Sequence, residues 1–150
     1  MARIVKKFGG TSIGDISRIK TAAQRVKEVF DQGSEVLVVV SAMSGWTDQV
    51  SGYCREMSSI YDAREYDSVV SSGEQITAGL MSIALQDLGI NSRSWNGWQI
   101  PIKTTSEHSN ASIVDIDTTE LEKRMTAREV PVVTGFQGIG QNNRITTLGR

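Results

Sequence analysis

The sequence predicts an α/β fold built on a mostly parallel β-sheet. Residues 36–40 and 131–134 form short apolar segments, which are typical of parallel strands covered on both faces. A short apolar segment near the start of the chain is followed by a helical pattern and then by residues 36–40. This order of strand, helix and strand is that of a βαβ unit. Small-residue turns follow the predicted strands, and open α/β sheets bind ligands outside the carboxyl ends of their strands.

The first helix has the clearest boundaries. A strand containing Ile4 and Val5 is expected before it, and a glycine turn connects the two. Asp15 is the expected N-cap, and Gly33 lies just past the expected end. The apolar residues that recur at helical spacing, and that predict one buried face, are Ile16, Ile19, Ala23, Val26 and Phe30.

A second small-residue turn, at residues 41–45, follows the strand at residues 36–40. Neighbouring parallel strands end at the same edge of a sheet, so this turn and the glycine turn at residues 9–14 are expected to lie side by side. Thr47 is a candidate N-cap of the next helix. The predicted buried face of that helix, with the single cysteine as a core thiol, consists of Val50, Tyr53, Cys54, Met57, Ile60 and Tyr61.

A longer helical stretch occupies residues 65–89 and is interrupted at residues 71–73. Gly89 is expected to end it. Glu74 would lie in the first turn after the interruption, where an acidic side chain complements the helix dipole whatever the protein does. The predicted buried face consists of Ile76, Leu80, Ile83, Ala84 and Leu88.

Short strands are predicted after residue 90, at residues 92–95, 100–103 and 112–116. Trp95 and Trp98 are expected to cover the core rather than to bind a cofactor. The buried strand at residues 131–134 follows these short strands. Predicted helices therefore dominate the first half of the chain, and predicted strands dominate the second half.

The remaining connections carry weaker signals. The polar loop at residues 104–110 holds the single histidine, His108, without a second metal-binding side chain at ligand spacing, so we expect a surface or supporting residue. Asp117 and Glu120 predict a capping box for a short helix. Residues 138–146 predict a hairpin around residues 141–143, because asparagine tolerates left-handed backbone conformations.

Composition excludes several classes of protein. The 150 residues suffice for one domain with a core, and 16 basic and 17 acidic residues are interspersed, with a net charge of -1. We therefore expect no nucleic-acid partner and no membrane partner. A single cysteine excludes an internal disulfide and a cysteine-rich metal site. No apolar run approaches the roughly 20 residues that span a bilayer, and no leader peptide is evident, so we expect a cytoplasmic protein.

The turn after the first strand suits a phosphate group. Glycines without Cβ atoms let an anion approach the backbone, and a helix N-terminus attracts negative charge. The lysine adds an ammonium beside the glycines. Its position before them excludes a Walker loop and a dinucleotide motif, while a plain glycine turn with a solvated lysine stays open. The turn reads Lys7-Phe8-Gly9-Gly10-Thr11-Ser12.

This lysine-first turn resembles the opening of the aspartokinases, members of the amino-acid kinase family. Five further blocks resemble the family in the family's order, at residues 38–45, 71–75, 97–99, 134–138 and 146–150. The sequence departs from the family pattern at Thr105, where an aspartate is usual, and at Ser112, where an arginine is usual. The resemblance implies a three-layer αβα sandwich, the amino-acid kinase fold, of which residues 1–150 would form an incomplete N-terminal portion without regulatory domains.

The resemblance also implies a reaction. ATP, with Mg²⁺, would transfer its γ-phosphate to the side-chain carboxylate of L-aspartate, giving 4-phospho-L-aspartate. This is the first step toward lysine, threonine, methionine and diaminopimelate. A carboxylate nucleophile is already ionised near neutral pH and needs no general base. The sequence offers no convincing catalytic histidine, which agrees with such a reaction, and we expect no metal ligand from the protein.

The resemblance assigns roles to individual residues. Lys7 would be catalytic, because it would neutralise charge on the phosphoryl group in transfer. The residues implied for the nucleotide are Lys7, Gly9, Gly10 and Ser41. The residues implied for aspartate are Thr47, Glu74 through the ammonium group, and Arg150 through the α-carboxylate. All these residues follow predicted strand ends or begin the next helix, so we expect them along one edge of a single sheet.

Two other hypotheses stay open. In the family the last block continues as Gly-Gly-Ser-Asp, whereas the sequence ends at Arg150. A non-catalytic remnant or proteolytic fragment that self-associates through an exposed sheet edge is one alternative, and an amino-acid kinase with another substrate is the second. We expect residues 1–150 alone to be inactive, and the enzyme that the resemblance implies to be a homo-oligomer.

Overall fold

The computed structural model describes residues 1–149, which form two four-stranded sheets and the helices that pack on them. The strands are β1 (Arg3–Phe8), β2 (Glu35–Val40), β3 (Ser92–Trp95), β4 (Ile102–Thr104), β5 (Ile113–Ile116), β6 (Val130–Thr134), β7 (Gln137–Ile139) and β8 (Ile145–Thr147). The helices are α1 (Ile16–Asp31), α2 (Trp46–Met57), α3 (Ala63–Val70), α4 (Ser72–Asp87) and α5 (Thr119–Thr126). Two short 3-10 turns are η1 (Gly10–Ile13) and η2 (Gln141–Asn143).

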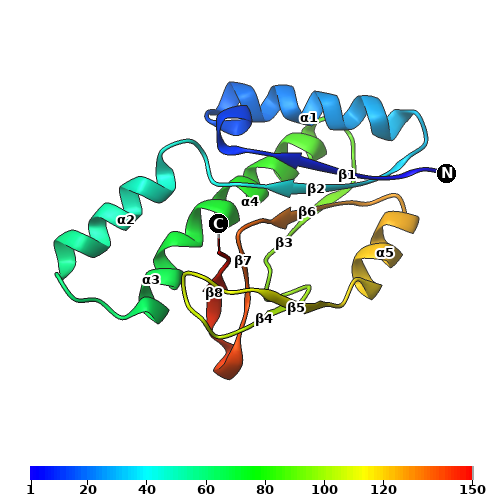
Figure 1. Cartoon of the computed structure of the whole chain (residues 1–150). Helices are drawn as coiled ribbons and strands as arrows, with labels where there is room; N and C mark the ends of the chain where they lie inside the picture. Colours follow the sequence, from blue (N-terminus) through cyan, green and yellow to red (C-terminus); the bar gives the residue numbers. More distant parts are fainter. Residues whose placement is uncertain (150) are drawn as a thin grey trace.

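The first sheet has the strand order β1-β2-β6-β3, and all of its neighbouring strands are parallel. Helices α1 and α4 pack on one face, and α5 packs on the other face (Figure 1). Helix, sheet and helix therefore form three layers, as the family resemblance implied. Parallel neighbours need crossover connections, and α1 is the crossover between β1 and β2.

Alternating side chains of β2 divide the core between the two faces. Val36, Val38 and Val40 are at most 1% exposed and belong to the apolar cluster beneath α1 and α4. Leu37 and Val39 pack against the cluster on the α5 side. Successive side chains of a strand point to opposite faces, so a strand covered twice requires an unbroken apolar segment. Each valine that is fully buried contributes about 1.5–3 kcal/mol to the stability of the first sheet.

The second sheet has the strand order β5-β4-β7-β8 and mixes antiparallel with parallel neighbours. Its strands have three or four residues each, and every residue of β5 is exposed. The chain therefore forms two sheets where a single sheet was expected, although the turns after β1 and β2 still end at one edge of the first sheet. The pairing partner of a short strand depends on where the chain is directed before it, and local residue pattern does not encode that direction.

A tight turn after β6 directs the chain out of the first sheet. Gly135 packs so closely on β2 that an added Cβ would lie 2.9 Å from the carbonyl oxygen of Val40. Phe136 has a φ of 69°, in the left-handed region that a bulky side chain seldom adopts. The turn sends residues 137–147 into the second sheet instead of extending the first.

Several predicted ends are confirmed. The Asp15 side chain accepts a hydrogen bond from the third residue of α1 and caps that helix. Gly33 and Gly89 have φ values of 95° and 80° and follow the ends of α1 and α4. The predicted hairpin joins β7 to β8, and Asn142 and Asn143 adopt left-handed φ values of 57° and 56°.

Two predicted helix starts were wrong. Thr47 is not the N-cap of α2, because Gly45, with a φ of 81°, occupies that position and the helix begins two residues earlier than predicted. The capping box of α5 is not formed either. Asp117 accepts a hydrogen bond from the Thr119 N–H, but the Glu120 side chain binds Arg124 instead of reaching back.

The predicted buried faces were only partly correct. Cys54 is buried and free, as expected. Several other apolar residues that were predicted to be buried are exposed: Ile16, Tyr53, Met57, Ile60, Tyr61, Ile76 and Ile83. On α4 the buried apolar residues are Ala78, Met81 and Leu85. This helix carries apolar side chains on several faces, so spacing alone does not select the face that packs on the sheet.

The strand-rich half gave a similar result. Trp95 is 4% exposed and covers the core as predicted, whereas Trp98 is 44% exposed. The two positions that depart from the family pattern face each other across the β4–β5 connection. The Ser112 N–H donates to the Thr105 hydroxyl at 3.1 Å, and neither residue lines the pocket described below.

Candidate functional site

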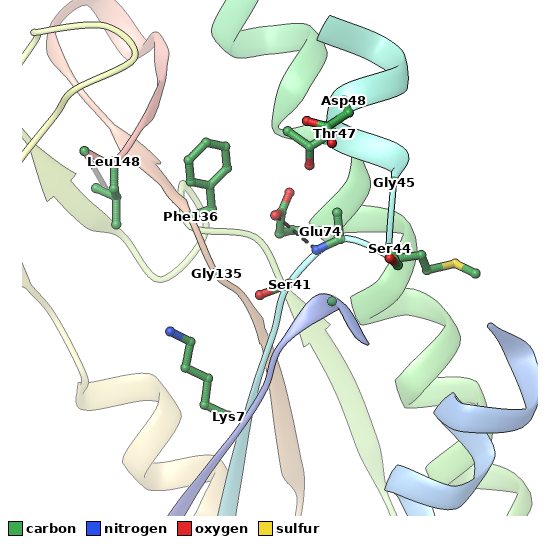
Figure 2. Close-up of a pocket in the computed structure, with 14 residues that line it drawn as sticks. Lys7, Ser41, Ser44, Gly45, Thr47, Asp48, Glu74, Gly135, Phe136 and Leu148 are labelled. Carbon is green, nitrogen blue, oxygen red and sulfur yellow. Dashed lines mark hydrogen bonds between the residues drawn. The ribbon is translucent and has the colours of Figure 1, made fainter. Parts of the chain in front are cut away.

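A pocket of about 530 Å³ opens at the carboxyl edge of the first sheet (Figure 2). Lys7 near the end of β1, residues 41–45 after β2, and Gly135 with Phe136 after β6 line its base. The starts of α2 and α4, together with residues after β8, contribute the remaining walls. Parallel strands end at a common edge, so segments far apart in the sequence meet in this pocket.

The glycine turn lies beside the turn after β2, as predicted. A Cβ added to Gly10 would lie 3.1 Å from the Ala42 carbonyl oxygen, so a larger residue would require the two turns to move slightly apart. Gly10 lines the pocket, whereas Gly9 lies beside it and is not among the lining residues. The Gly9 carbonyl accepts a hydrogen bond from the Ser12 N–H at 3.0 Å and closes the turn.

Lys7 brings positive charge to the pocket. Its side chain is exposed, and Figure 2 shows it pointing into the pocket from the β1 side. Lys6, the preceding residue, belongs to the opposite face of the strand, because successive strand residues alternate. Of these two neighbouring lysines, Lys7 is therefore the one that points into the pocket.

Glu74 lies in the first turn of α4, and it is buried, with an exposed fraction of 3%. Its Oε1 accepts a hydrogen bond from the Ala42 N–H at 3.1 Å, which joins α4 to the turn after β2. The preceding residue makes this contact possible. A Cβ on Gly73 would lie 2.4 Å from Trp46 Cδ1 and 2.5 Å from Ala42 Cβ, so glycine lets α4 begin close to that turn.

The start of α2 forms another wall. Thr47 lines the pocket from the first turn of α2, next to the exposed carboxylate Asp48. Figure 2 shows both side chains on the side of the pocket where Glu74 lies. Sequence reasoning singled out Thr47 and missed Asp48, which is the next residue and lies in the same first turn of α2.

Residues from the second half of the chain complete the pocket. Phe136 and Leu148 line it together on the side opposite α2 (Figure 2). The Leu148 N–H donates to the Phe136 carbonyl at 2.9 Å, which joins the two residues into one wall. Neither was chosen as a site residue, although the sequence blocks that contain them had been noted. Their backbone geometry was the missing information.

The pocket collects most of the residues that the sequence singled out. Those that line it are Lys7, Gly10, Ser41, Thr47 and Glu74. Arg150 lies outside the described residues. His108 does not line the pocket, and it contacts a buried carboxylate on α3 instead.

The chemistry of the pocket suits a phosphate group beside an amine. A lysine and a glycine turn offer positive charge and backbone N–H groups to phosphate oxygens, and the buried Glu74 offers negative charge to an ammonium group. Within residues 1–149, no cluster of three or more His, Cys, Asp or Glu side chains could hold a metal ion. These residues therefore fit a nucleotide phosphate, and they fit Mg²⁺ only where phosphate oxygens and water supply most of its ligands.

None of the helices described between residues 1 and 149 is long and apolar enough to cross a membrane.

Comparisons with known proteins agree with this geometry. The model of the amino acid kinase family matches residues 2–150. An aspartokinase from Rickettsia conorii is 45% identical over 153 residues, which cover 100% of this chain and 38% of that protein. The chain therefore spans well under half the length of this curated relative.

Solved structures share the fold. The crystal structure of the aspartate kinase from Synechocystis matches with a TM-score of 0.81 and 36% identity, over 100% of this chain and 24% of that one. The E. coli aspartokinase III in complex with aspartate and ADP matches with a TM-score of 0.84 over 100% of this chain and 44% of that one. At 19% identity, the second match supports the fold alone.

Proposed function

Because the chain belongs to the amino acid kinase family, we propose that it forms the N-terminal portion of a kinase domain that phosphorylates L-aspartate with ATP. The product would be 4-phospho-L-aspartate. One observation carries the proposal: a lysine, a glycine turn and a buried carboxylate, from three separate elements, line one pocket at the carboxyl edge of a parallel sheet. Relatives named aspartokinase cover the whole chain and support aspartate as the substrate.

Lys7, in this proposal, is the catalytic residue. Phosphoryl transfer spreads negative charge over the transferred group, and the protein contributes mainly position and positive charge. The exposed ammonium of Lys7 enters the pocket beside the glycine turn, where it would neutralise that charge. The backbone N–H of Gly10 and the Ser41 hydroxyl would hold the phosphate oxygens, while Gly9, which lies beside the pocket, would shape the turn.

The opposite side of the pocket would hold aspartate. Glu74 would bind the ammonium group through its buried carboxylate. Thr47 would add a hydroxyl from the start of α2. Arg150 would bind the α-carboxylate through its planar guanidinium, which matches a carboxylate with two parallel hydrogen bonds. The side-chain carboxylate would then attack the γ-phosphate without a general base, because it is already ionised.

Mg²⁺ bound to ATP would supply further positive charge at the phosphate oxygens. The proposal also includes a place in metabolism, as the first step toward lysine, threonine, methionine and diaminopimelate, and a homo-oligomeric enzyme. It places the reaction in the cytoplasm, where ATP is available and where a single buried thiol, Cys54, stays reduced.

Replacing Lys7 tests this proposal directly. In the complete gene product that carries this chain, Lys7→Ala is expected to lower the turnover number about a hundredfold or more, because charge stabilisation is lost mainly in the transition state. The KM for aspartate should change much less. Release of ADP in the presence of aspartate and Mg-ATP is the measurement.

Lys6→Ala is the matched control, since it removes the same charge from the opposite face of β1. Its turnover should remain near that of the unmodified protein. A Lys7→Ala protein within about threefold of normal turnover would contradict the catalytic role of Lys7. A panel of other amino acids in the same assay identifies the substrate, and faster turnover of any of them than of aspartate would replace aspartate in the proposal.

A further inference from the structure

Asp67 is a buried carboxylate that lies outside the pocket. It belongs to α3 and is 0% exposed. The Thr147 hydroxyl and N–H donate to it at 2.6 and 3.0 Å, and the Ser109 hydroxyl and N–H donate at 3.2 and 3.1 Å. His108 Nδ1 lies 2.7 Å from Oδ2. A buried carboxylate is costly unless its oxygens are satisfied, so this set of donors holds one defined arrangement.

The contacts of Asp67 lead in two directions. His108 and Ser109 belong to the loop between β4 and β5, which does not contribute to the pocket. Thr147 is the last residue of β8, and the next two residues, Leu148 and Gly149, line the pocket. One carboxylate therefore connects a loop remote from the pocket with a strand end that forms its wall.

The end of β8 is held by directional polar contacts, including those to this carboxylate. The strand has three residues, Ile145–Thr147, and the threonine at its end is 1% exposed. After it, the Leu148 N–H donates to the Phe136 carbonyl at 2.9 Å and the Gly149 N–H donates to the Ala111 carbonyl at 3.1 Å. Each of these contacts is directional, so a displacement of Thr147 would pass directly to the wall.

We propose that Asp67 is a positioning residue of the pocket, which fixes the wall formed by Leu148 and Phe136 by holding Thr147. The wall faces the start of α2, across the space assigned to aspartate, and Gly149 directly precedes the proposed carboxylate ligand Arg150 in the sequence. This inference rests on the proposed function, because it takes the pocket as the aspartate site.

The direct substitution, Asp67→Ala, would leave several buried donors without an acceptor and is expected to disrupt the fold. The test therefore changes the partners of Asp67. Thr147→Val removes the hydroxyl donor on the pocket side and keeps nearly the same shape. Ser109→Ala removes a hydroxyl donor to the same oxygen, Oδ1, on the remote side. Thr147→Ser keeps a hydroxyl and serves as the rescue variant.

In the complete gene product, Thr147→Val is expected to raise the KM for aspartate about tenfold, which corresponds to the loss of one hydrogen bond to a charged group. The turnover number should change much less. Ser109→Ala and Thr147→Ser should stay within about twofold of the unmodified KM. Equal KM values for Thr147→Val and Ser109→Ala, or an unchanged KM in both, would overturn the positioning role and leave Asp67 a structural anchor.

Hydrogen exchange provides a readout that does not depend on activity. Amide protons of residues 147–149 should exchange about tenfold faster in Thr147→Val than in Ser109→Ala, because only the first loses a contact of β8. Exchange that is equally fast in the two variants would overturn the inference. If the unmodified protein releases no ADP with aspartate, the proposed function fails, while faster exchange in Thr147→Val alone would still support the role of Asp67.

Discussion

The two sheets of the molecule are held by different interactions. The first sheet is covered on both faces, and apolar side chains such as Val38 and Val132 are 0% exposed. In the second sheet, Ile102 of β4 joins the apolar cluster on the α5 side, but Val114 of β5 is 67% exposed, and polar contacts connect the sheet to α3 and to Ser71 between α3 and α4. Gln137 donates to the Ser71 carbonyl at 2.9 Å, and Asp67 accepts from Thr147.

This difference divides the pocket into two kinds of wall. The glycine turn after β1 and the turn after β2 are attached to strands of the apolar core. This core resists displacement because its packing is dense and involves many contacts. The wall at Leu148 is held in place by a few directional hydrogen bonds. Loss of a core side chain should therefore lower the stability of the whole molecule, whereas loss of a polar contact in the second sheet should change the shape of the site with a smaller loss of stability.

The same substitution placed in both regions gives the largest expected difference. Ile19→Ala empties a site on α1 that is 2% exposed, and it should lower the free energy of unfolding by about 2–5 kcal/mol. Ile113→Ala acts on β5, where the side chain is 48% exposed, and should cost about 0.5 kcal/mol. Urea denaturation measures both values, and similar losses in the two proteins would refute the division into an apolar and a polar region.

Two glycines of α4 probe the packing beside the pocket. A Cβ on Gly73 would lie 2.4 Å from Trp46 Cδ1, so Gly73→Ala should lower the free energy of unfolding by about 1–3 kcal/mol through overpacking. Gly79 has no neighbour within 4 Å of the added Cβ, and Gly79→Ala should raise stability by about 0.5–1 kcal/mol, because alanine favours a helix. Thermal unfolding of the two variants should shift in opposite directions, and a shift in the same direction would contradict the tight start of α4.

Glu74 lines the pocket beside the turn after β2, and its charge can be removed without removing its hydrogen bond to that turn. Glu74→Gln keeps a carbonyl oxygen that can accept from the Ala42 N–H, so the turn after β2 should persist. The KM for aspartate should rise about tenfold, because the ammonium group loses its counter-charge. Glu65→Gln, which affects an exposed ion pair with Arg144, is the control. Normal aspartate saturation in Glu74→Gln would assign Glu74 to structure alone.

The smallest expected effect concerns an exposed contact on α3. Hydrogen bonds from the Arg64 side chain and backbone lower the pKa of Asp62, the N-cap, from its usual 3.8 to about 2. Since the folded value lies below the unfolded value, the contribution of Asp62 is complete above pH 3.8 and disappears as the pH falls through about 2. An NMR titration of the carboxyl group should show that midpoint, and Arg64→Ala should return it toward 3.8. An unchanged midpoint in that variant would contradict the assigned cause.

Much of the first sheet and of its pocket edge could be predicted because the signals are local. The apolar run of β2 follows from alternation along one strand, and the Asp15 cap and Gly33 follow from preferences within one helix end. The meeting of the turns after β1 and β2 follows from parallel neighbours that end at a common edge. Lys7 could therefore be assigned to the edge where the structure shows it.

The second sheet and its contribution to the pocket could not be predicted in this way. Asp67 appeared in the sequence as one acidic residue on a helix, yet its partners are 41 to 80 positions away along the chain. Phe136 belonged to a noted block, but its left-handed backbone arises from the turn that leaves the first sheet. Local pattern determines which residues form a strand or helix. Contacts between distant segments decide which short strands pair, which face of α4 is buried and which carboxylate holds the pocket wall, because these depend on the packing of the whole chain.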